Sequence, residues 1–312
     1  MKKFIKRLFI FLLPVTLFIG LWEYGLSRIQ NSYSLKNAQL AAQAPEIQVL
    51  VLGPSHALRG VNPEYFSMRG YNAANMAQPL FYDTRIALKY LDKMTSLKVV
   101  LIDISYPSLW SELFETPEGF RDYFYADYWN IRYPGIKWYD IHIYSKILQY
   151  GNDKAWKYAL KGFKVNLTPG YYNNGWALVE GRESPINDSA GYAEISLHEK
   201  YFKQQYFYDN MGCITDLLKE LNRRKVQAVF FTPPETQAMY KFMAKSRLIT
   251  IDSALAVLCA TYHCEKYSFL TDQRFSDSDF RDVQHLNERG AIKFSKIINE
   301  EILKKYDTPA SK

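Results

Sequence analysis

The fold is indicated most clearly by Ile47-Gln-Val-Leu-Val-Leu52, which is followed at once by Gly53-Pro-Ser-His56. The first six residues form an almost continuous apolar run rich in Val and Leu, which is typical of a strand buried on both faces of a parallel sheet. The Gly-Pro pair that follows breaks the strand and predicts a tight turn. The first strand of the globular part therefore ends at a turn that carries a serine and a histidine.

Similar apolar runs alternate with segments of helical periodicity along the rest of the chain. Strand-like runs occupy 71–76, 99–104, 226–232 and 266–270, and helix-like segments occupy 83–94, 210–225, 236–261 and 287–305, the last with Asn287 as its N-cap. This alternation predicts a three-layer α/β/α domain of the flavodoxin-like kind, with about five parallel strands, over residues 46–306. Residues 105–209 lack the alternation and are expected to form a long aromatic-rich insertion, and 307–312 a short tail.

The N-terminus has the pattern of a membrane-targeting segment. Residues 1–7 (MKKFIKR) are basic, and Leu8–Trp22 contains no charge. This order predicts a signal anchor over residues 1–25 of a single-pass inner-membrane protein, with the N-terminus cytoplasmic and the main domain periplasmic or extracellular. The uncharged run is shorter than the ~20 residues of a comfortable span. A cleaved signal peptide and a buried core helix are the alternatives. Residues 26–45 are expected to be a polar, partly helical stalk.

The distribution of charge narrows the possible partners. The 312 residues carry a formal net charge of +7, but residues 1–36 alone hold six bases against one acid. The rest of the chain is nearly balanced, which argues against a nucleic-acid partner. With 48% hydrophobic and 23% charged residues, the composition also excludes a disordered protein.

The chain has three cysteines, too few for a scaffold built on disulfides. Cys259 and Cys264 are close enough in sequence to pair if a turn brings them together, which would leave Cys213 free. Three buried thiols are the alternative. The chain shows no short Cys/His cluster with zinc-ligand spacing, so we expect neither a metal nor a cofactor.

Two short motifs carry the candidate chemistry. Ser55 follows the first strand, and the carboxyl end of a strand in an open parallel sheet is where ligands bind. A serine there can offer both a nucleophilic hydroxyl and a backbone N–H for an oxyanion. Asp282-Val-Gln-His285 precedes the last helix, and an aspartate three residues before a histidine can orient the ring as a general base. Alone, each motif is weak, because turns and loops often contain such residues.

Together, GPSH at 53–56 and DVQHLNERG at 282–290 resemble the first and last sequence blocks of the SGNH, or GDSL-like, hydrolase superfamily. The stretch 72–83 falls where the second block belongs. The resemblance implies Ser55 as nucleophile, His285 as general base and Asp282 as its orienting partner. It also implies an oxyanion hole made by the Ser55 N–H and a second-block donor, for which Asn75 and Gln78 are the candidates.

Three further polar residues are expected to support these groups from close by. His56 follows the nucleophile, and Asp103 and Ser105 end the third strand, where the superfamily's usual Gly-x-Asn-Asp is missing. His56 is also able to reach the reacting atoms, and Asp103 is equally plausible as a strand-end cap.

The resemblance is strongest to a divergent, membrane-anchored branch that includes proteins similar to the D-alanyl transfer protein of teichoic acids and the alginate O-acetylation proteins. It implies an extracytoplasmic esterase or O-acyltransferase, often acetyl-specific, acting on a cell-envelope polysaccharide with a membrane-bound O-acyltransferase as donor. The aromatic stretches 120–140 and 170–182 suit carbohydrate stacking, although we expect most of these aromatic residues to form the core of the insertion. The alternative function is a catalytically inactive polysaccharide-binding or assembly factor with the same fold.

Overall fold

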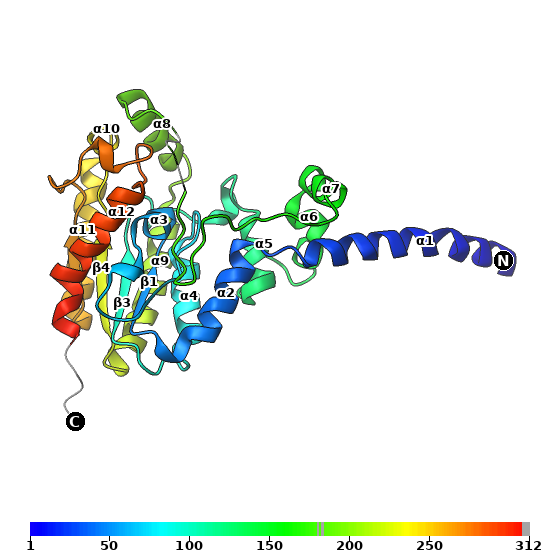
Figure 1. Ribbon diagram of the computed structural model, residues 1–312, viewed down its shortest axis with the longest axis horizontal. Helices are drawn as coiled ribbons and strands as arrows, with labels where there is room; N and C mark the ends of the chain where they lie inside the picture. The colour runs from blue at the N-terminus through cyan, green and yellow to red at the C-terminus, as the bar shows by residue number, and fades with distance from the viewer. Residues whose placement is uncertain (180, 182–183, 308–312) are drawn as a thin grey trace. The chain divides into compact units, whose positions relative to one another are not determined.

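The computed structural model describes residues 1–179, 181 and 184–307 (Figure 1). It contains two compact units. The first consists of Met1–Leu35 and Phe120–Pro169, and the second of Lys36–Gly119 and Gly170–Lys312. The last five residues of the predicted tail lie outside the described residues. The predicted insertion is therefore shared, since its middle belongs to the first unit and its two ends to the second.

The second unit is built on a parallel sheet of five strands, as predicted. The strands lie in the order β2-β1-β3-β4-β5, and every neighbouring pair is parallel. Their bounds are β1 Val49–Leu52, β2 Gly70–Asn72, β3 Val99–Asp103, β4 Gln227–Thr232 and β5 Glu265–Ser268. This is the doubly wound order in which the chain changes direction between β1 and β3, so the carboxyl ends of those two strands flank the usual ligand position.

Helices cover both faces of the sheet, which completes the three predicted layers (Figure 1). Alternate strand residues such as Val51, Leu101 and Phe231 share one buried core with α3 (Ser55–Gly60) and α12 (Glu288–Ile298). The intervening residues point to the opposite face, because successive side chains of a strand alternate. There α4 (Leu80–Tyr90) packs against α9 (Gln204–Arg223), and α11 (Lys245–Tyr262) packs against α9 and β5.

Two of the predicted helices are less regular than expected. The segment predicted as one helix over 236–261 is divided into α10 (Gln237–Tyr240) and α11, with Thr236 capping the first by accepting the N–H of Met239. The C-terminal helix begins after Asn287, which accepts the Gly290 N–H as the predicted N-cap. Its α-helical part ends at Ile298, and the chain continues as a π turn and a 3-10 turn to Tyr306.

The first unit joins the N-terminal helix to the middle of the predicted insertion. Helix α1 (Lys2–Ser27) is long and apolar enough to cross a membrane, and its apolar span is not buried by the rest of the chain. It packs against α6 (Lys146–Tyr150) and α7 (Asn152–Leu160), and α5 (Arg121–Phe124) belongs to the same unit. Many of the aromatic residues in this part form a core, including Phe124, Tyr125 and Trp129.

Helix α2 (Ser32–Gln43) lies within the segment predicted to be a stalk. Its second half is not a free spacer, because Lys36 and Leu40 are completely buried. The hydroxyl of Tyr71 on β2 donates to the Lys36 carbonyl at 3.0 Å, and Tyr90 of α4 donates to the Asn37 side chain at 2.5 Å. From Lys36 onward this helix is thus part of the α/β unit.

The structure brings Cys259 and Cys264 close together and leaves Cys213 apart from them. The two sulfur atoms lie 2.9 Å apart, and all three residues are free thiols. The cause is local: His263 adopts a left-handed conformation (φ 54°) that ends α11 and turns the chain directly into β5. A disulfide between Cys259 and Cys264 stays a prediction.

Candidate active site

Ser55 lies at the first position of α3, on a turn that is held from several sides. Gly53 has a positive φ of 146°, and a Cβ there would lie 2.5 Å from the Cβ of Asp103, so only glycine fits. Its N–H donates to Asp83 Oδ1 at 2.7 Å, and its carbonyl accepts the Asn75 N–H at 3.2 Å. The loops after β1, β2 and β3 therefore fix the position of the serine together.

His285 and Asp282 come from the loop before α12. The Arg281 N–H donates to the His285 carbonyl at 2.9 Å, which closes the loop. Asp282 Oδ1 accepts the backbone N–H groups of Gln284 and His285 at 3.0 and 2.7 Å, a local turn that short acidic side chains favour. The same carboxylate lies 2.9 and 3.0 Å from His285 Nδ1. Both side chains are buried, so the ring is held in one orientation.

The structure brings the three residues of the two motifs into one chain of hydrogen bonds. His285 Nε2 lies 2.8 Å from Ser55 Oγ, although the two residues are 230 positions apart in sequence. With Nδ1 facing a carboxylate, the neutral ring carries its proton on Nδ1, and Nε2 is then the acceptor of the Ser55 hydroxyl. This is the geometry in which a histidine can withdraw a proton from a serine.

The surroundings keep His285 neutral and Asp282 ionised. Burial lowers the pKa of His285, the nearby charges of His56 and Arg59 lower it further, and the hydrogen bond to Asp282 only partly opposes them, so the pKa is about 4. Burial alone would raise the pKa of Asp282, but hydrogen bonds from His285 and from the loop backbone hold it well below its usual value. Arg281 Nε, at 3.8 Å from Asp282 Oδ2, adds a nearby positive charge.

A second buried set of the same residue types lies beside the first. His56 stacks on His285, with ring centroids 5.2 Å apart. Its Nε2 lies 3.2 Å from Glu235 Oε1, and its Nδ1 lies 3.3 Å from Ser105 Oγ. Ser105 Oγ donates to Asp103 Oδ1 at 2.6 Å. His56, Asp103 and Ser105, expected from the sequence to support the site, are thus placed together behind the first set.

This second set holds a proton on its histidine. Burial by itself lowers the pKa of His56, but the charges of Glu235, Asp103 and Asp282 outweigh burial and raise it to about 9. Burial raises the pKa of Asp103 to about 7 and also raises that of Glu235, with the charge of His56 opposing both shifts. At neutral pH the two stacked rings therefore differ, since His56 is charged and His285 is not.

Two acidic residues of this region were not identified as site residues from the sequence. Glu235 follows Pro233 and Pro234 after β4, and Asp83 lies in the first turns of α4. A signal was present for Glu235, because it is an acid just beyond the carboxyl end of a predicted strand, where ligand sites form in such sheets. Asp83 gave no such signal, since its bond to Gly53 joins segments that are 30 residues apart.

The two candidate oxyanion donors have different surroundings. Gln78 donates from Nε2 to Asp83 Oδ1 at 2.6 Å and to the Ala73 carbonyl at 3.3 Å, so its amide hydrogens serve the loop. Asn75 is completely buried, and neither its amide nitrogen nor its oxygen has a hydrogen-bond partner among the described residues. Its backbone lies against Gly53, two residues from Ser55. The geometry thus disfavours Gln78 as an oxyanion donor and leaves the Asn75 amide available.

Two buried titratable side chains, Lys36 and Asp83, support the same loop. Lys36 Nζ of α2 donates to the Ala74 carbonyl, and the charge of Asp83 acts on it. Burial lowers the pKa of Lys36 well below its usual value and raises that of Asp83 well above its own. Because Asp83 also bonds Gly53 and Gln78, this pair connects α2 to the serine turn.

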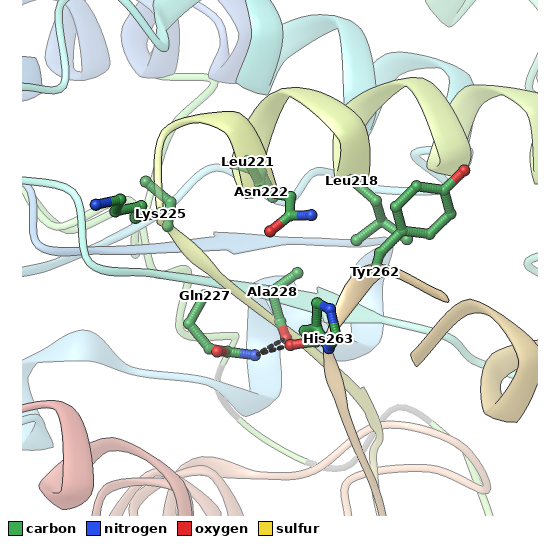
Figure 2. A pocket seen from close by; sticks show the side chains of 9 residues that line it. Leu218, Leu221, Asn222, Lys225, Gln227, Ala228, Tyr262 and His263 are labelled. Carbon is green, nitrogen blue, oxygen red and sulfur yellow. Dashed lines mark hydrogen bonds between the residues drawn. The ribbon is translucent and has the colours of Figure 1, made fainter. Parts of the chain in front are cut away.

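A pocket of about 270 Å³ lies elsewhere on the same unit (Figure 2). It is lined by the end of α9 and the start of β4, and Gln227 Nε2 donates there to the carbonyls of His263 and Ala228. It is thus at the amino end of the strands, away from Ser55, which follows the carboxyl end of β1. Among the described residues no group of three or more His, Cys, Asp or Glu side chains is arranged to hold a metal ion.

Comparison with known proteins adds little to the description of this site. No protein-family model matches the chain, and no curated protein matches it. One solved structure that it resembles is a Bacteroides fragilis protein described as a "putative acylhydrolase". The sequences are 10% identical, the TM-score is 0.42, and the match covers 86% of this chain and 95% of that one. A likeness this distant carries no conclusion about function, so the functional proposal depends on the site itself.

Proposed function

We propose that this protein is an acyl-ester enzyme with Ser55 as nucleophile, His285 as general base and Asp282 as the group that orients and stabilises the base. The observation that carries the proposal is the continuous contact from Ser55 Oγ to His285 Nε2 (2.8 Å) and from His285 Nδ1 to Asp282 (2.9 Å). A base that is neutral at pH 7 and already on the hydroxyl is ready to accept its proton.

In the proposed reaction Ser55 Oγ attacks the carbonyl carbon of an ester while its proton passes to His285 Nε2. The resulting imidazolium is stabilised by ionised Asp282. Ser55 N–H, in the first turn of α3 where helical N–H groups have no intrahelical partner, would donate to the oxyanion together with the Asn75 amide. Collapse breaks the ester bond, and the leaving alcohol takes the proton from His285. The acyl group is then bound to Ser55.

The acyl group then leaves by the same steps in reverse order. A hydroxyl attacks the acyl-serine carbonyl, His285 accepts its proton, and Ser55 regains it as the acyl bond breaks. Water as the attacking hydroxyl makes the protein an esterase, and a sugar hydroxyl makes it an O-acyltransferase. We favour a cell-envelope polysaccharide as acceptor, acetyl as the acyl group and a membrane-bound O-acyltransferase as donor, because the sequence motifs resemble the membrane-anchored branch of the SGNH superfamily.

The proposed location supports that choice. A basic N-terminus followed by an apolar helix favours an anchor with the α/β unit outside the cytoplasm. The aromatic residues expected to stack on sugar divide into two groups. Trp129 and Trp176 are buried in their units and serve as core, whereas Trp138 and Tyr139 are exposed. Glu180 and Arg182 of the second aromatic stretch lie outside the described residues.

The test is covalent labelling of the full-length protein with a fluorophosphonate probe, followed by peptide mapping. We expect label on Ser55, loss of label and of aryl-acetate hydrolysis in Ser55→Ala, and retention of both in Ser105→Ala, the matched buried serine of the second set. Absence of labelling in the folded wild-type protein, with polymer binding intact, would reject the enzyme and favour the inactive binding factor.

A further inference from the structure

The first unit exposes large apolar side chains in the segment that follows its aromatic core. Six of them are at least half exposed, namely Trp138 (69%), Tyr139 (64%), Ile141 (64%), Tyr144 (69%), Trp156 (51%) and Leu160 (71%). Such a concentration within 23 residues is uncommon on a surface that faces only water, and contiguous exposed apolar surface generally marks an interaction site. We call residues 136–164, which contain all six, the collar.

The collar is fastened to the last turns of α1. Trp22 Nε1 donates to the Ala155 carbonyl of α7 at 3.2 Å, and its ring lies edge-on to Trp156 at 5.5 Å between centroids. The Glu23 carboxylate accepts the Ser145 hydroxyl at 2.5 Å and the Lys146 N–H at 2.6 Å. Glu23 of α1 thus caps the start of α6, and the preceding residue, Trp22, contacts α7.

A close approach reinforces this attachment. A Cβ on Gly25 would lie 2.4 Å from the ring of Phe163, so α1 and the end of the collar touch where only glycine leaves room. Because three successive turns of the collar are tied to Trp22, Glu23 and Gly25, the collar and the end of α1 must lie at the same depth in any membrane that α1 enters.

The length of the apolar run in α1 sets that depth. Its uncharged part, Leu8–Trp22, has 15 residues. At 1.5 Å per residue it spans roughly 22 Å, whereas the hydrocarbon core of a bilayer is about 30 Å thick. With Arg7 at the cytoplasmic surface, the hydrocarbon boundary on the far side therefore falls beyond Trp22. The side chains that are present at that level are those of the collar.

The charges of the collar suit the same location. Residues 137–164 contain six Lys and two Asp, and Lys154, Lys157 and Lys161 are exposed on or just after α7. Aromatic side chains combined with lysines are typical of the membrane–water interface, where rings sit at headgroup level and ammonium groups meet anionic lipid.

We propose that the collar is a second membrane-contacting surface, which lies in the headgroup region of the far leaflet around the end of α1 and binds anionic lipid. The inference rests on the proposed insertion of α1 and is independent of the proposed chemistry at Ser55. In this arrangement the aromatic rings and Leu160 supply the apolar contact that the short run of α1 lacks, and the three lysines supply the attraction to headgroups.

The first experiment uses quenching of tryptophan emission by lipids with brominated acyl chains, with the full-length protein in nanodiscs. We expect Trp138→Phe to remove part of the quenchable emission. The matched control Trp176→Phe, which alters a buried ring of the α/β unit, should remove only emission that brominated lipid does not quench. Quenchable emission that is unchanged in Trp138→Phe would overturn the proposal.

The second experiment tests the lipid charge by acetylating surface amines in nanodiscs with and without phosphatidylglycerol. Lys154, Lys157 and Lys161 should react more slowly in the anionic discs, while Lys219 on α9 should react equally in both. Equal rates at the three collar lysines would overturn the assignment to anionic headgroups.

Alkaline carbonate extraction distinguishes failure of the α1 anchor from failure of the collar proposal. If the chain is stripped from membranes, α1 does not span the bilayer and the collar proposal is rejected with it. If the chain stays in the membrane while Trp138 emission is not quenched, the insertion of α1 stands and only the proposed membrane contact of the collar is rejected.

Discussion

Two buried sets of serine, histidine and carboxylate lie side by side in the α/β unit, and their difference explains which one can react. In the first, Asp282 is satisfied by backbone N–H groups of its own loop, so it stays ionised and leaves His285 neutral. In the second, the acids Glu235 and Asp103 each keep one carboxylate oxygen without a hydrogen-bond partner among the described residues, and His56 keeps the proton. Burial outweighs the nearby carboxylate at His285, whereas the charges of several carboxylates outweigh burial at His56, and this balance decides the charge of each ring.

The two serines differ in the same sense. Ser105 gives its hydroxyl hydrogen to Asp103 at 2.6 Å, whereas Ser55 faces the neutral nitrogen of His285 at 2.8 Å. The imidazole beside Ser105 is that of His56, which already holds a proton at neutral pH and so cannot accept another. The first set therefore has a neutral histidine that can act as a base for its serine, whereas the histidine of the second set carries a positive charge.

The largest expected effect is on catalysis and follows from a change of the carboxylate in the first set, Asp282. Asp282→Asn should lower kcat for aryl-acetate hydrolysis by about 10⁴, because the amide favours the wrong tautomer of His285 and no longer stabilises its charged form. Steady-state kinetics on purified full-length protein measures this. An Asp282→Asn enzyme within tenfold of wild type would show that Asp282 does not orient and stabilise the base.

The next effect is on stability. Glu235→Gln leaves the charge of His56 without its ion-pair partner in a buried position, which costs about 3–5 kcal/mol of unfolding free energy when a buried pair is broken. Adding His56→Gln to that variant should recover much of the loss. A double-mutant cycle of chemical unfolding tests this, and strictly additive losses would show that the two side chains are not coupled.

A smaller effect on stability is expected at Gly53, where the serine turn of the first set lies against Asp103 of the second. Gly53→Ala forces a Cβ against Asp103 and requires a left-handed backbone from a residue that disfavours it, at a cost of about 1–3 kcal/mol. Because Gly53 also positions Ser55, activity should fall along with stability. Gly212→Ala on α9, where a Cβ meets nothing within 4 Å, is the control and should be neutral or stabilising. Equal melting temperatures of the two variants would contradict the proposed constraint.

The smallest effect is a shift in pH dependence. Activity of the wild type should fall as the pH drops through about 4, where His285 becomes protonated. His56→Gln removes a positive neighbour, so the pKa of His285 should rise and the acid limb should move toward its ordinary value near 6.5. The groups that face His56 from the neighbouring segments are Glu235, Asp103, Asp282 and His198. An unchanged acid limb of the pH–activity profile in His56→Gln would show that the charge of His56 does not affect the pKa of His285.

The same values predict how stability depends on pH. The folded-state pKa of His56 lies above its unfolded value, so the stability it contributes is complete below about pH 6.5 and is lost as the pH rises through about 9. The folded-state pKa of His285 lies below its unfolded value, so its contribution is present above about pH 6.5 and is lost as the pH falls through about 4. Melting temperatures of wild type and His56→Gln across this range should diverge on the acid side and converge on the alkaline side.

The parts of this site that the sequence predicted are those encoded locally. The apolar run of β1, the Gly-Pro break after it and the three-residue spacing of Asp282 and His285 each depend on neighbours in the chain. Glu235 and Asp83 escaped notice because their roles depend on partners that the fold brings from another strand or loop. The same reason applies to Gln78, whose amide is used by Asp83.

Sequence periodicity likewise predicted the sheet but not the arrangement of the first unit. Strands β1, β3 and β4 were recognisable because parallel strands buried on both faces are mostly apolar, whereas β2 and β5 are short and more polar. The collar has short helices separated by Tyr-rich turns, and its contacts with α1 join residues more than 100 positions apart. No local pattern encodes a partner at that distance, so its aromatic residues were expected only as core or as a sugar-binding surface.

The separation of Ser55 and His285 by 230 positions also has a consequence for biosynthesis. A chain exported from its N-terminus delivers the serine turn across the membrane first and the histidine loop almost last. Until the final segment arrives, β1 can pair with its neighbours, but the hydroxyl has no base and is an ordinary alcohol. If the chain is exported as proposed, Ser55 therefore gains its base only when translocation is nearly complete, and a chain truncated shortly before Asp282 would lack a base for its serine.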